Sequence, residues 1–207
     1  MTDLFFRSER GGGVRVLRLI SDDGTNRLTL ASVKALTEML LVLTKVPEPL
    51  IVAGNEKCFS VGADLREIRA LDGVAARDFS NRGQQLMSAI CSFPAPVYAA
   101  ISGYCMGGGL DLALACHRRI AAPNAILGHR GASLGLITGW GGTQRLPMLI
   151  GKAQSLSMFI SAKKIHAAEA LQLGLLDGVA EDPVADAAHR IQSASARGPH
   201  PTLRFPN

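Results

Sequence analysis

The sequence predicts an α/β protein in which helices cover a β-sheet. Short apolar strands alternate along the chain with segments whose apolar residues recur at helical spacing. With 207 residues, of which 47% are hydrophobic and 19% charged, the chain can bury a sizeable core and is too apolar for extensive disorder. These observations favour a single folded domain.

The predicted elements follow one another in a regular order. Residues 14–20 (VRVLRLI) alternate like a strand, and the apolar spacing of LTLASVKALTEMLLVLTK then predicts a helix that Pro47 and Pro49 end. Further strands are predicted at 50–53, 97–101 and 119–122, with residues 54–64 as a loop. Further helices are predicted from about residue 65, at 78–92, at 107–116, from about 142, from about 152, within 161–182 with a strand-like end, and in PVADAAHRIQSASA beyond residue 182.

Charge and cysteine content narrow the possible partners and location. The formal net charge of +5 and the pI near 9.3 are compatible with an acidic ligand such as a nucleotide phosphate. Lys and Arg are too scattered to favour DNA or RNA, so no nucleic-acid partner is expected. The four cysteines, at 58, 91, 105 and 116, lack the C-x-x-C spacing of zinc or redox sites and indicate reduced thiols of a cytoplasmic protein.

Neither of two segments indicates export or a membrane span. The first residues, MTDLFFRSERGGG, lack the layout of a signal peptide, so no export is expected. Residues 94–116 have the length of a membrane span, but they contain PAP, Ser102, three glycines and Asp111. Since a central carboxylate costs roughly 3 kcal/mol in a membrane, a buried strand, turn and helix are expected instead.

The segment GYCMGGGLD at 103–111 carries the strongest local signal for chemistry. Asp111 lies between two leucines and is the first charged residue after a charge-free stretch that begins at Gly83. If Gly108 opens a helix, its free N–H and the Asp111 carboxylate converge on one point. The alternative is that Asp111 only complements the helix dipole and that the glycines only permit close helix packing.

Several motifs, taken in order, carry a resemblance to a known family. They are CFSVGADLREI at 58–68, AAISGYCMGGGLDLALAC at 99–116 and GWGGTQRLPMLIG at 139–151, together with NRLTLASVKAL at 26–36 and SAKKIHAAEALQLGLLDGV at 161–179. In this order they resemble the enoyl-CoA hydratase/isomerase family, the crotonases. The resemblance covers the chain up to about residue 188. It implies a spiral of repeated strand-strand-helix units at 1–188, followed by a short frayed tail at 189–207.

The resemblance also implies a chemistry and a set of residues. Family members bind acyl-CoA thioesters, use no bound cofactor or metal, and hold the thioester oxygen with two backbone N–H groups at positions that match Ala63 and Gly108. Losing one such donor typically costs roughly 100- to 1000-fold in rate. An alternative for VGAD is an ordinary turn in which Asp64 caps the next helix. Hydratases of the family use two glutamates, of which the first matches Asp111.

The second acid of the family is missing from this sequence. Its position matches Gly131, which has no carboxylate, and this departure points away from a standard hydratase. In one branch of the family, the naphthoyl-CoA synthases, bicarbonate occupies the corresponding space, so a bicarbonate at Gly131 is considered. That branch has an Asp nearby, where this chain has Thr138. His129 and Arg130 beside the gap are candidates for holding an anion or moving a proton, the alternative being a packing or surface role.

The remaining candidate residues concern substrate binding. Trp140 is expected either to line the acyl pocket or to pack in the core. By position, the candidates for binding CoA or the acyl chain are Arg27, Lys57, Gly62, Asp64, Leu65 and Arg66, the basic ones being equally compatible with solvated surface charges. The family's final helical subdomain is largely missing, so apolar surface should be exposed. By resemblance, assembly as a trimer or hexamer is implied.

The resulting prediction is an acyl-CoA enzyme that hydrates an enoyl-CoA or moves its double bond, with Asp111 as the proton-transfer group. The alternative is an acyl-CoA-binding pseudoenzyme or truncated subunit without turnover. A nucleotide-binding α/β domain is disfavoured, because neither G-x-G-x-x-G after the first strand nor G-x-x-x-x-G-K is present.

Overall fold

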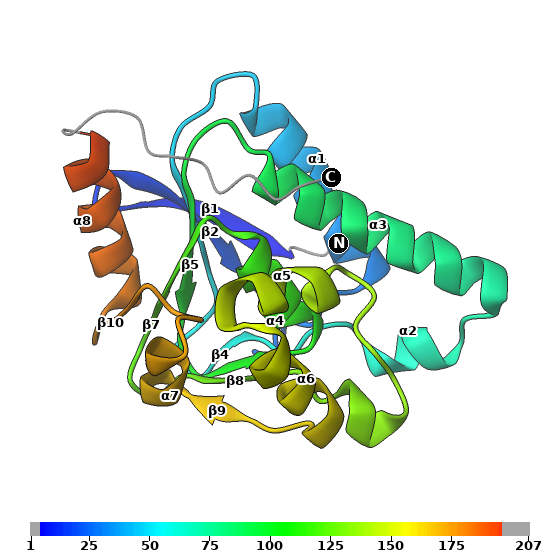
Figure 1. The fold of residues 1–207 in the computed structure, drawn as a ribbon. Helices are drawn as coiled ribbons and strands as arrows, with labels where there is room; N and C mark the ends of the chain where they lie inside the picture. Colours follow the sequence, from blue (N-terminus) through cyan, green and yellow to red (C-terminus); the bar gives the residue numbers. More distant parts are fainter. Residues whose placement is uncertain (1–4, 196–207) are drawn as a thin grey trace.

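The computed structural model describes residues 5–195, and its strands divide between two sheets (Figure 1). The larger sheet contains, in order across it, β1 (Phe6–Gly11), β2 (Val14–Leu19), β3 (Leu50–Ala53), β5 (Val97–Ile101), β7 (Arg118–Ala121) and β10 (Gly178–Val179). The smaller sheet contains β4 (Cys58–Ser60), β6 (Tyr104–Met106), β8 (Ile126–Gly128) and β9 (Ile165–His166).

Helices cover both sheets and separate the strand pairs. They are α1 (Leu30–Leu43), α2 (Leu65–Arg69), α3 (Gly73–Cys91), α4 (Gly108–Ala115), α5 (Gly142–Ile150), α6 (Lys152–Ser161), α7 (Ala167–Gln172) and α8 (Pro183–Ser195), with a 3-10 helix, η1 (Gly131–Leu134). In this order the chain repeats one unit, in which a strand enters the larger sheet, the next enters the smaller sheet, and a helix follows. The pairs β3–β4, β5–β6 and β7–β8 each follow this rule. The predicted α/β class and strand-strand-helix repeat are therefore confirmed.

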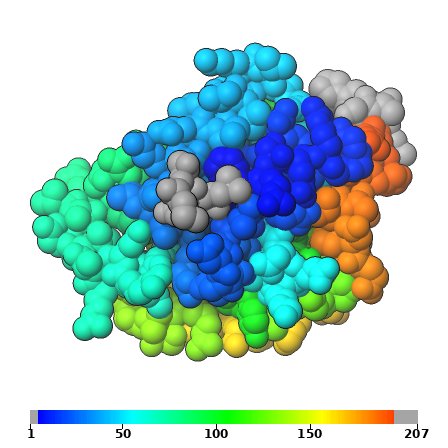
Figure 2. Space-filling model, turned by 180° about the vertical axis from the view of Figure 1, so that it is seen from behind, coloured from blue at the N-terminus to red at the C-terminus, as the bar shows by residue number. Residues whose placement is uncertain are grey.

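The central strands are buried because helices cover both faces of the larger sheet. Every residue of β3 and of β5 is buried, and the two strands run parallel with Leu50 opposite Val97. On the outer face, α8 packs Ala187 and Ile191 against Ile51 of the sheet. The back view shows α8 beside the β1–β2 hairpin (Figure 2), where Gln192 donates a hydrogen bond to the Gly12 carbonyl.

The predicted boundary at residue 188 falls inside α8. The helix continues to Ser195 because its buried face, which includes Ala188, extends to Ile191. The helix expected beyond residue 182 is confirmed. The rest of the predicted tail, residues 196–207, lies outside the described residues.

Other differences from the prediction concern short strands and helix starts. The strands β1, β4, β6, β8 and β9 were not predicted. Of these, β4 lies in the segment expected as a loop and β9 in the segment expected as a helix. Three of them have only three residues, too few for an alternating pattern to be read. Helix α3 begins at Gly73 rather than at 78, because the Asp72 carboxylate accepts a hydrogen bond of 2.8 Å from the Ala75 N–H and caps an earlier turn.

Candidate active site

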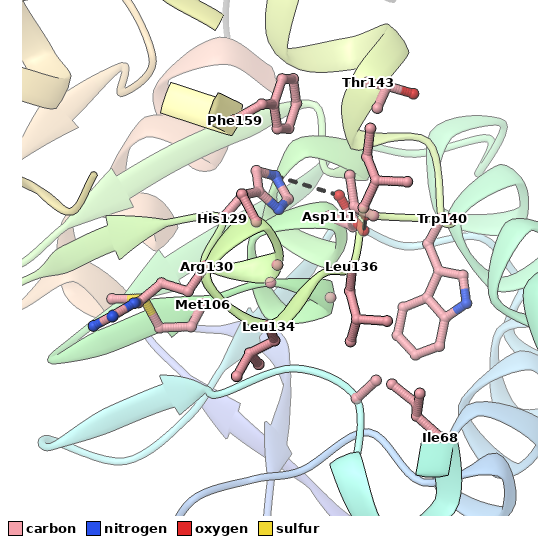
Figure 3. Close-up of a pocket in the computed structure, with 18 of the residues that line it drawn as sticks. Ile68, Met106, Asp111, His129, Arg130, Leu134, Leu136, Trp140, Thr143 and Phe159 are labelled. Carbon is pink, nitrogen blue, oxygen red and sulfur yellow. Dashed lines mark hydrogen bonds and ion pairs between the residues drawn. The ribbon is translucent and has the colours of Figure 1, made fainter. Parts of the chain in front are cut away.

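A cavity of about 1000 Å³ lies at the start of α4, between α2, α3, η1 and α6 (Figure 3). That volume suits a drug-sized or acyl ligand. Its lining is mainly apolar, with side chains from α2 and the residues after it, from α3, from η1 and the loop after it, and from α6: Leu65, Ile68, Leu71, Phe79, Leu134, Leu136, Ile137, Leu156, Phe159 and Ile160. Within residues 5–195, Asp111 is the only acid and His129 the only histidine in this lining.

Ala63 presents its backbone to this cavity. Its neighbours form a bridge to Leu28, in which the Gly62 carbonyl accepts from the Leu28 N–H at 2.9 Å and the Asp64 N–H donates to the Leu28 carbonyl at 3.4 Å. In a parallel bridge the residue between two bonded neighbours points its own N–H to the opposite side. The Ala63 N–H therefore faces away from Leu28, on the side where Ala63 lines the cavity.

Gly108 begins α4 beside Ala63. Its N–H belongs to the first turn of the helix, where backbone donors have no partner within the helix. The two segments approach closely, since a Cβ placed on Gly62 would lie 2.6 Å from the Gly108 nitrogen, and one on Gly108 would lie 3.3 Å from the Ala63 nitrogen. Gly62 also has a φ of +88°, which favours glycine. The N–H of Ala63 and the N-terminus of α4 therefore meet at one edge of the cavity.

Trp140 both packs in the core and lines the cavity. Its side chain is buried, and its ring centroid lies 5.2 Å from that of Phe79. The indole rests on Gly83 of α3 and on Gly108, where a Cβ would lie 2.6 Å from Cζ3. Core packing of Trp140 is thus observed, its lining of an acyl pocket stays a prediction, and the glycine triplet does permit close packing.

Asp111 is a buried carboxylate that faces the cavity. It is 1% exposed, and one oxygen, Oδ2, accepts a hydrogen bond from the Thr138 hydroxyl. The other oxygen, Oδ1, has no hydrogen-bond partner among the described residues. Burial raises the pKa of Asp111 from 3.8 to about 7, against smaller lowering effects of Thr138, Arg145 and the Gly142 backbone. This carboxyl can therefore gain and lose a proton near neutral pH.

His129 points at the free oxygen of Asp111 (Figure 3). Nε2 of His129 lies 3.5 Å from Oδ1 of Asp111, and the imidazole packs on Phe159 with ring centroids 5.1 Å apart. The His129 side chain is 4% exposed, and burial lowers its pKa to about 4. The sequence singled out His129 as a neighbour of position 131, but nothing in the sequence indicated that it faces Asp111.

Gly131 lies at the start of η1 and lines the cavity, and the structure gives a reason for glycine at this position. Its carbonyl accepts a hydrogen bond of 2.9 Å from the Leu136 N–H, which closes a tight loop. A Cβ on Gly131 would lie 2.5 Å from the Leu136 carbonyl oxygen. The loop therefore has no room for a side chain in its present path.

The other predicted binding residues differ in their place relative to this cavity. Leu65 lines it, whereas Lys57 is an exposed residue before β4. Arg66 pairs with Asp64 at 2.7 Å, and Arg27 pairs with Asp23. Asp64 also caps α2 by accepting from the Arg66 N–H, and hydrogen bonding from the Arg66 side chain lowers its pKa to about 2. Asp64 therefore caps the next helix, as the alternative for VGAD has it, while Ala63 lines the cavity and its role as a backbone donor stays a prediction.

No group of three or more His, Cys, Asp or Glu side chains in residues 5–195 is placed to hold a metal ion. Over the same residues, no helix combines the length and hydropathy that crossing a membrane requires.

Solved structures with this arrangement of sheets and helices are crotonase-fold proteins. Pseudomonas aeruginosa DspI matches with a TM-score of 0.86 and 32% identity, over 94% of this chain and 76% of that one. An enoyl-CoA hydratase from Thermoplasma volcanium matches with a TM-score of 0.87 and 30% identity, over 95% of this chain and 79% of that one. The fold predicted from the resemblance is confirmed.

The sequence comparisons give the family. The enoyl-CoA hydratase/isomerase family profile matches residues 9–204, so the chain belongs to this family. A probable enoyl-CoA hydratase of Bacillus subtilis is 48% identical over 134 residues, which are 64% of this chain and 52% of that protein. The fatty acid oxidation complex subunit alpha of Shewanella loihica is 43% identical over 138 residues, 65% of this chain and 20% of that protein. The chain thus matches about half of the first relative and a fifth of the second.

Proposed function

We propose that the chain binds an acyl-CoA thioester with its carbonyl oxygen at the N–H groups of Ala63 and Gly108, and that Asp111 transfers a proton at the acyl carbons. The observation that carries this proposal is the convergence of two backbone segments and one buried carboxylate on a single apolar cavity. The apolar lining suits an acyl chain, and the first turn of α4 suits an oxygen that gains negative charge. No metal or other cofactor enters the proposed reaction.

The proposed chemistry is hydration of an enoyl-CoA or migration of its double bond. Two N–H donors aimed at the thioester oxygen stabilise an enolate, which makes the α-carbon acidic and the β-carbon electrophilic. For isomerisation, a carboxylate removes a proton from one carbon and returns it two carbons away. Because the pKa of Asp111 is raised to about 7, the energetic cost of moving the proton in either direction is small near neutral pH.

The test is turnover of two substrates by the wild-type chain and matched variants. Loss of enoyl-thioester absorbance from crotonyl-CoA reports hydration, and its gain from a 3-enoyl-CoA reports isomerisation. Asp111→Asn is expected to lower whichever activity is present by roughly 100-fold or more. Asp78→Asn, which changes an exposed acid on α3, is the control. Each assay is run with and without bicarbonate, because a rate increase with bicarbonate would place that anion near Gly131.

An acyl-CoA-binding role without turnover is the second candidate. It is favoured by the missing carboxylate at Gly131 and by apolar side chains exposed at the cavity rim, where Ile137 is 74% and Ile160 is 70% exposed. Such a rim suits a partner subunit, and a trimer or hexamer is the assembly we propose from the family resemblance. Acyl-CoA binding without reaction of either substrate would favour this candidate, and light scattering would give the assembly. Reduced thiols, such as the free Cys58 and Cys105, support a cytoplasmic location.

A further inference from the structure

His129 is a buried polar side chain of the cavity for which packing and hydrogen bonding give no structural reason. Most buried polar atoms in proteins have a hydrogen-bond partner, and an unpaired one costs about 1–3 kcal/mol. Among residues 5–195, neither ring nitrogen of His129 has such a partner. The chain contains a contrasting case in His117, whose Nδ1 accepts from the Val97 N–H at 2.8 Å and whose Nε2 lies 3.2 Å from the Cys91 carbonyl oxygen. A purely structural role explains His117 but not His129.

The position of His129 matches a need of the proposed chemistry. Hydration requires one group to take a proton from water and another to give a proton to the α-carbon. Asp111 is the only acid in the described lining, and the tight loop at Gly131 excludes a side chain there. His129 follows β8 directly, lines the same cavity, and lies 3.5 Å from the free Oδ1 of Asp111.

We propose that His129 is the second proton-transfer group of this site and that it shares one proton with Asp111. This inference rests on the proposed function, because it assigns a role in the same reaction. In place of two acids, the site then has one acid, Asp111, and one neutral base, His129. Asp111 lies on α4 and His129 directly follows β8. Packing on Phe159 fixes the plane of the imidazole, so that Nε2 stays directed at Asp111.

The ionisation of the two groups fits a role of Asp111 as the acid and of His129 as the base. Burial raises the pKa of Asp111 to about 7 and lowers that of His129 to about 4, so between these values the proton resides on Asp111 and the imidazole is neutral. The tautomer with its proton on Nδ1 leaves the Nε2 lone pair facing the carboxyl group. The other charged groups nearby are Arg145 on α5, which lowers the Asp111 pKa, and Arg130 and Lys152, which line the cavity.

The hydration step balances with these two groups alone. A water molecule gives one proton to Nε2 of His129 as its oxygen bonds to the β-carbon. The π electrons of the alkene form the thioester enolate at Ala63 and Gly108, and Asp111 gives its proton to the α-carbon. An imidazolium and a carboxylate remain, and transfer of the proton from Nε2 to Oδ1 restores the starting pair. Isomerisation needs no water, and there the Asp111 carboxylate both removes the α-proton and returns it to the γ-carbon, so the role of His129 is tested on hydration.

The experiment compares wild type, His129→Gln and the control His166→Gln, which changes an exposed histidine on β9. Acyl-CoA affinity and the pH dependence of kcat are measured for each. We expect kcat of His129→Gln to fall by roughly 100-fold or more, with acyl-CoA affinity within threefold of wild type. The wild-type profile should be bell-shaped, with limbs near pH 4 and 7 that belong to the pair, and the acid limb should disappear in His129→Gln. Retention of kcat within threefold by His129→Gln would overturn the proposal.

A second measurement needs no active variant. In wild type, the imidazole ¹⁵N signals of His129 should shift near pH 7 as Asp111 ionises, and Asp111→Asn should abolish that response. If His129→Gln fails to fold or to bind acyl-CoA, the pH response of the wild-type imidazole signals is the deciding test. Absence of that response would overturn the proposal that His129 and Asp111 share a proton. A wild-type chain that turns over neither substrate overturns the proposed function and the role of His129 together. An active wild type with an equally active His129→Gln overturns only the latter.

Discussion

Replacing Asp111 by Asn is expected to stabilise the folded chain above pH 7, although it removes the proposed proton-transfer group. Asn has nearly the same volume as Asp, and its carbonyl oxygen can still accept from the Thr138 hydroxyl. The substitution therefore changes little except the ionisation. A buried carboxyl that must ionise in the folded state is unfavourable for stability, and functional sites often carry such a cost.

The magnitude follows from the difference in pKa. Burial raises the pKa of Asp111 from 3.8 to about 7, and at about 1.4 kcal/mol for each unit this corresponds to roughly 4 kcal/mol. Below about pH 4 the carboxyl is protonated in both folded and unfolded chains and costs nothing. As the pH rises, the unfolded chain releases this proton first, so the wild-type free energy of unfolding falls relative to Asp111→Asn until about pH 7. Above pH 7 the difference is constant.

The assay is urea unfolding followed by circular dichroism at about pH 4.5, 6 and 8 for wild type, Asp111→Asn and Asp78→Asn. His129, whose pKa is lowered to about 4, contributes an opposite trend below about pH 6.5, but both chains share it and it cancels in the difference. The exposed Asp78 pairs with Arg82 on the surface of α3, so its variant should show little pH-dependent difference. A wild type and an Asp111→Asn variant whose stability difference does not change with pH would refute the reasoning.

Three further substitutions test the geometry of the site. Thr138→Val should raise the Asp111 pKa by about one to two units, because a hydrogen bond to a charged group is lost, and should move the alkaline limb of the pH–rate profile upward. Gly62→Ala should lower turnover by about 100-fold, since the added Cβ displaces the start of α4. The control is Gly174→Ala, which should keep its activity: Gly174 also has a positive φ, +79°, but a Cβ there would make only ordinary contacts. Gly131→Glu should lower stability by about 1–3 kcal/mol, and a gain of hydration in that variant would contradict the account of the loop.

The parts of the fold with a strong local pattern could be predicted from the sequence. The strand at 97–101 has the predicted bounds, because a short run of apolar residues ends at Ser102 and a glycine turn. The helix at the glycine triplet was expected one residue longer at each end, 107–116 against Gly108–Ala115. Strands of the smaller sheet, such as Tyr104–Met106, were missed because they pair with distant segments and have too few residues for a period.

The site was predictable where it depends on a motif and not where it depends on distant packing. Ala63, Gly108 and Asp111, which the motifs singled out, all line the cavity. The contact between His129 and Asp111 arises because β8 and α4 belong to neighbouring repeats, a proximity that no local pattern contains. The reason for glycine at 131 could not be predicted from the sequence either. Glycine is required there by the path of the loop, which the identity of the neighbouring residues does not reveal.

Proton exchange at the α-carbon is the most direct test of the central claim, which is that Asp111 and two backbone N–H groups generate a thioester enolate. Butyryl-CoA incubated with the chain in deuterium oxide has no double bond to hydrate, so mass spectrometry of the recovered thioester reports enolate formation alone. The account predicts deuterium uptake at the α-carbon by wild type and a loss of roughly 100-fold or more in Asp111→Asn. Uptake at the same rate by both proteins, or none by a wild type that binds butyryl-CoA, would contradict it.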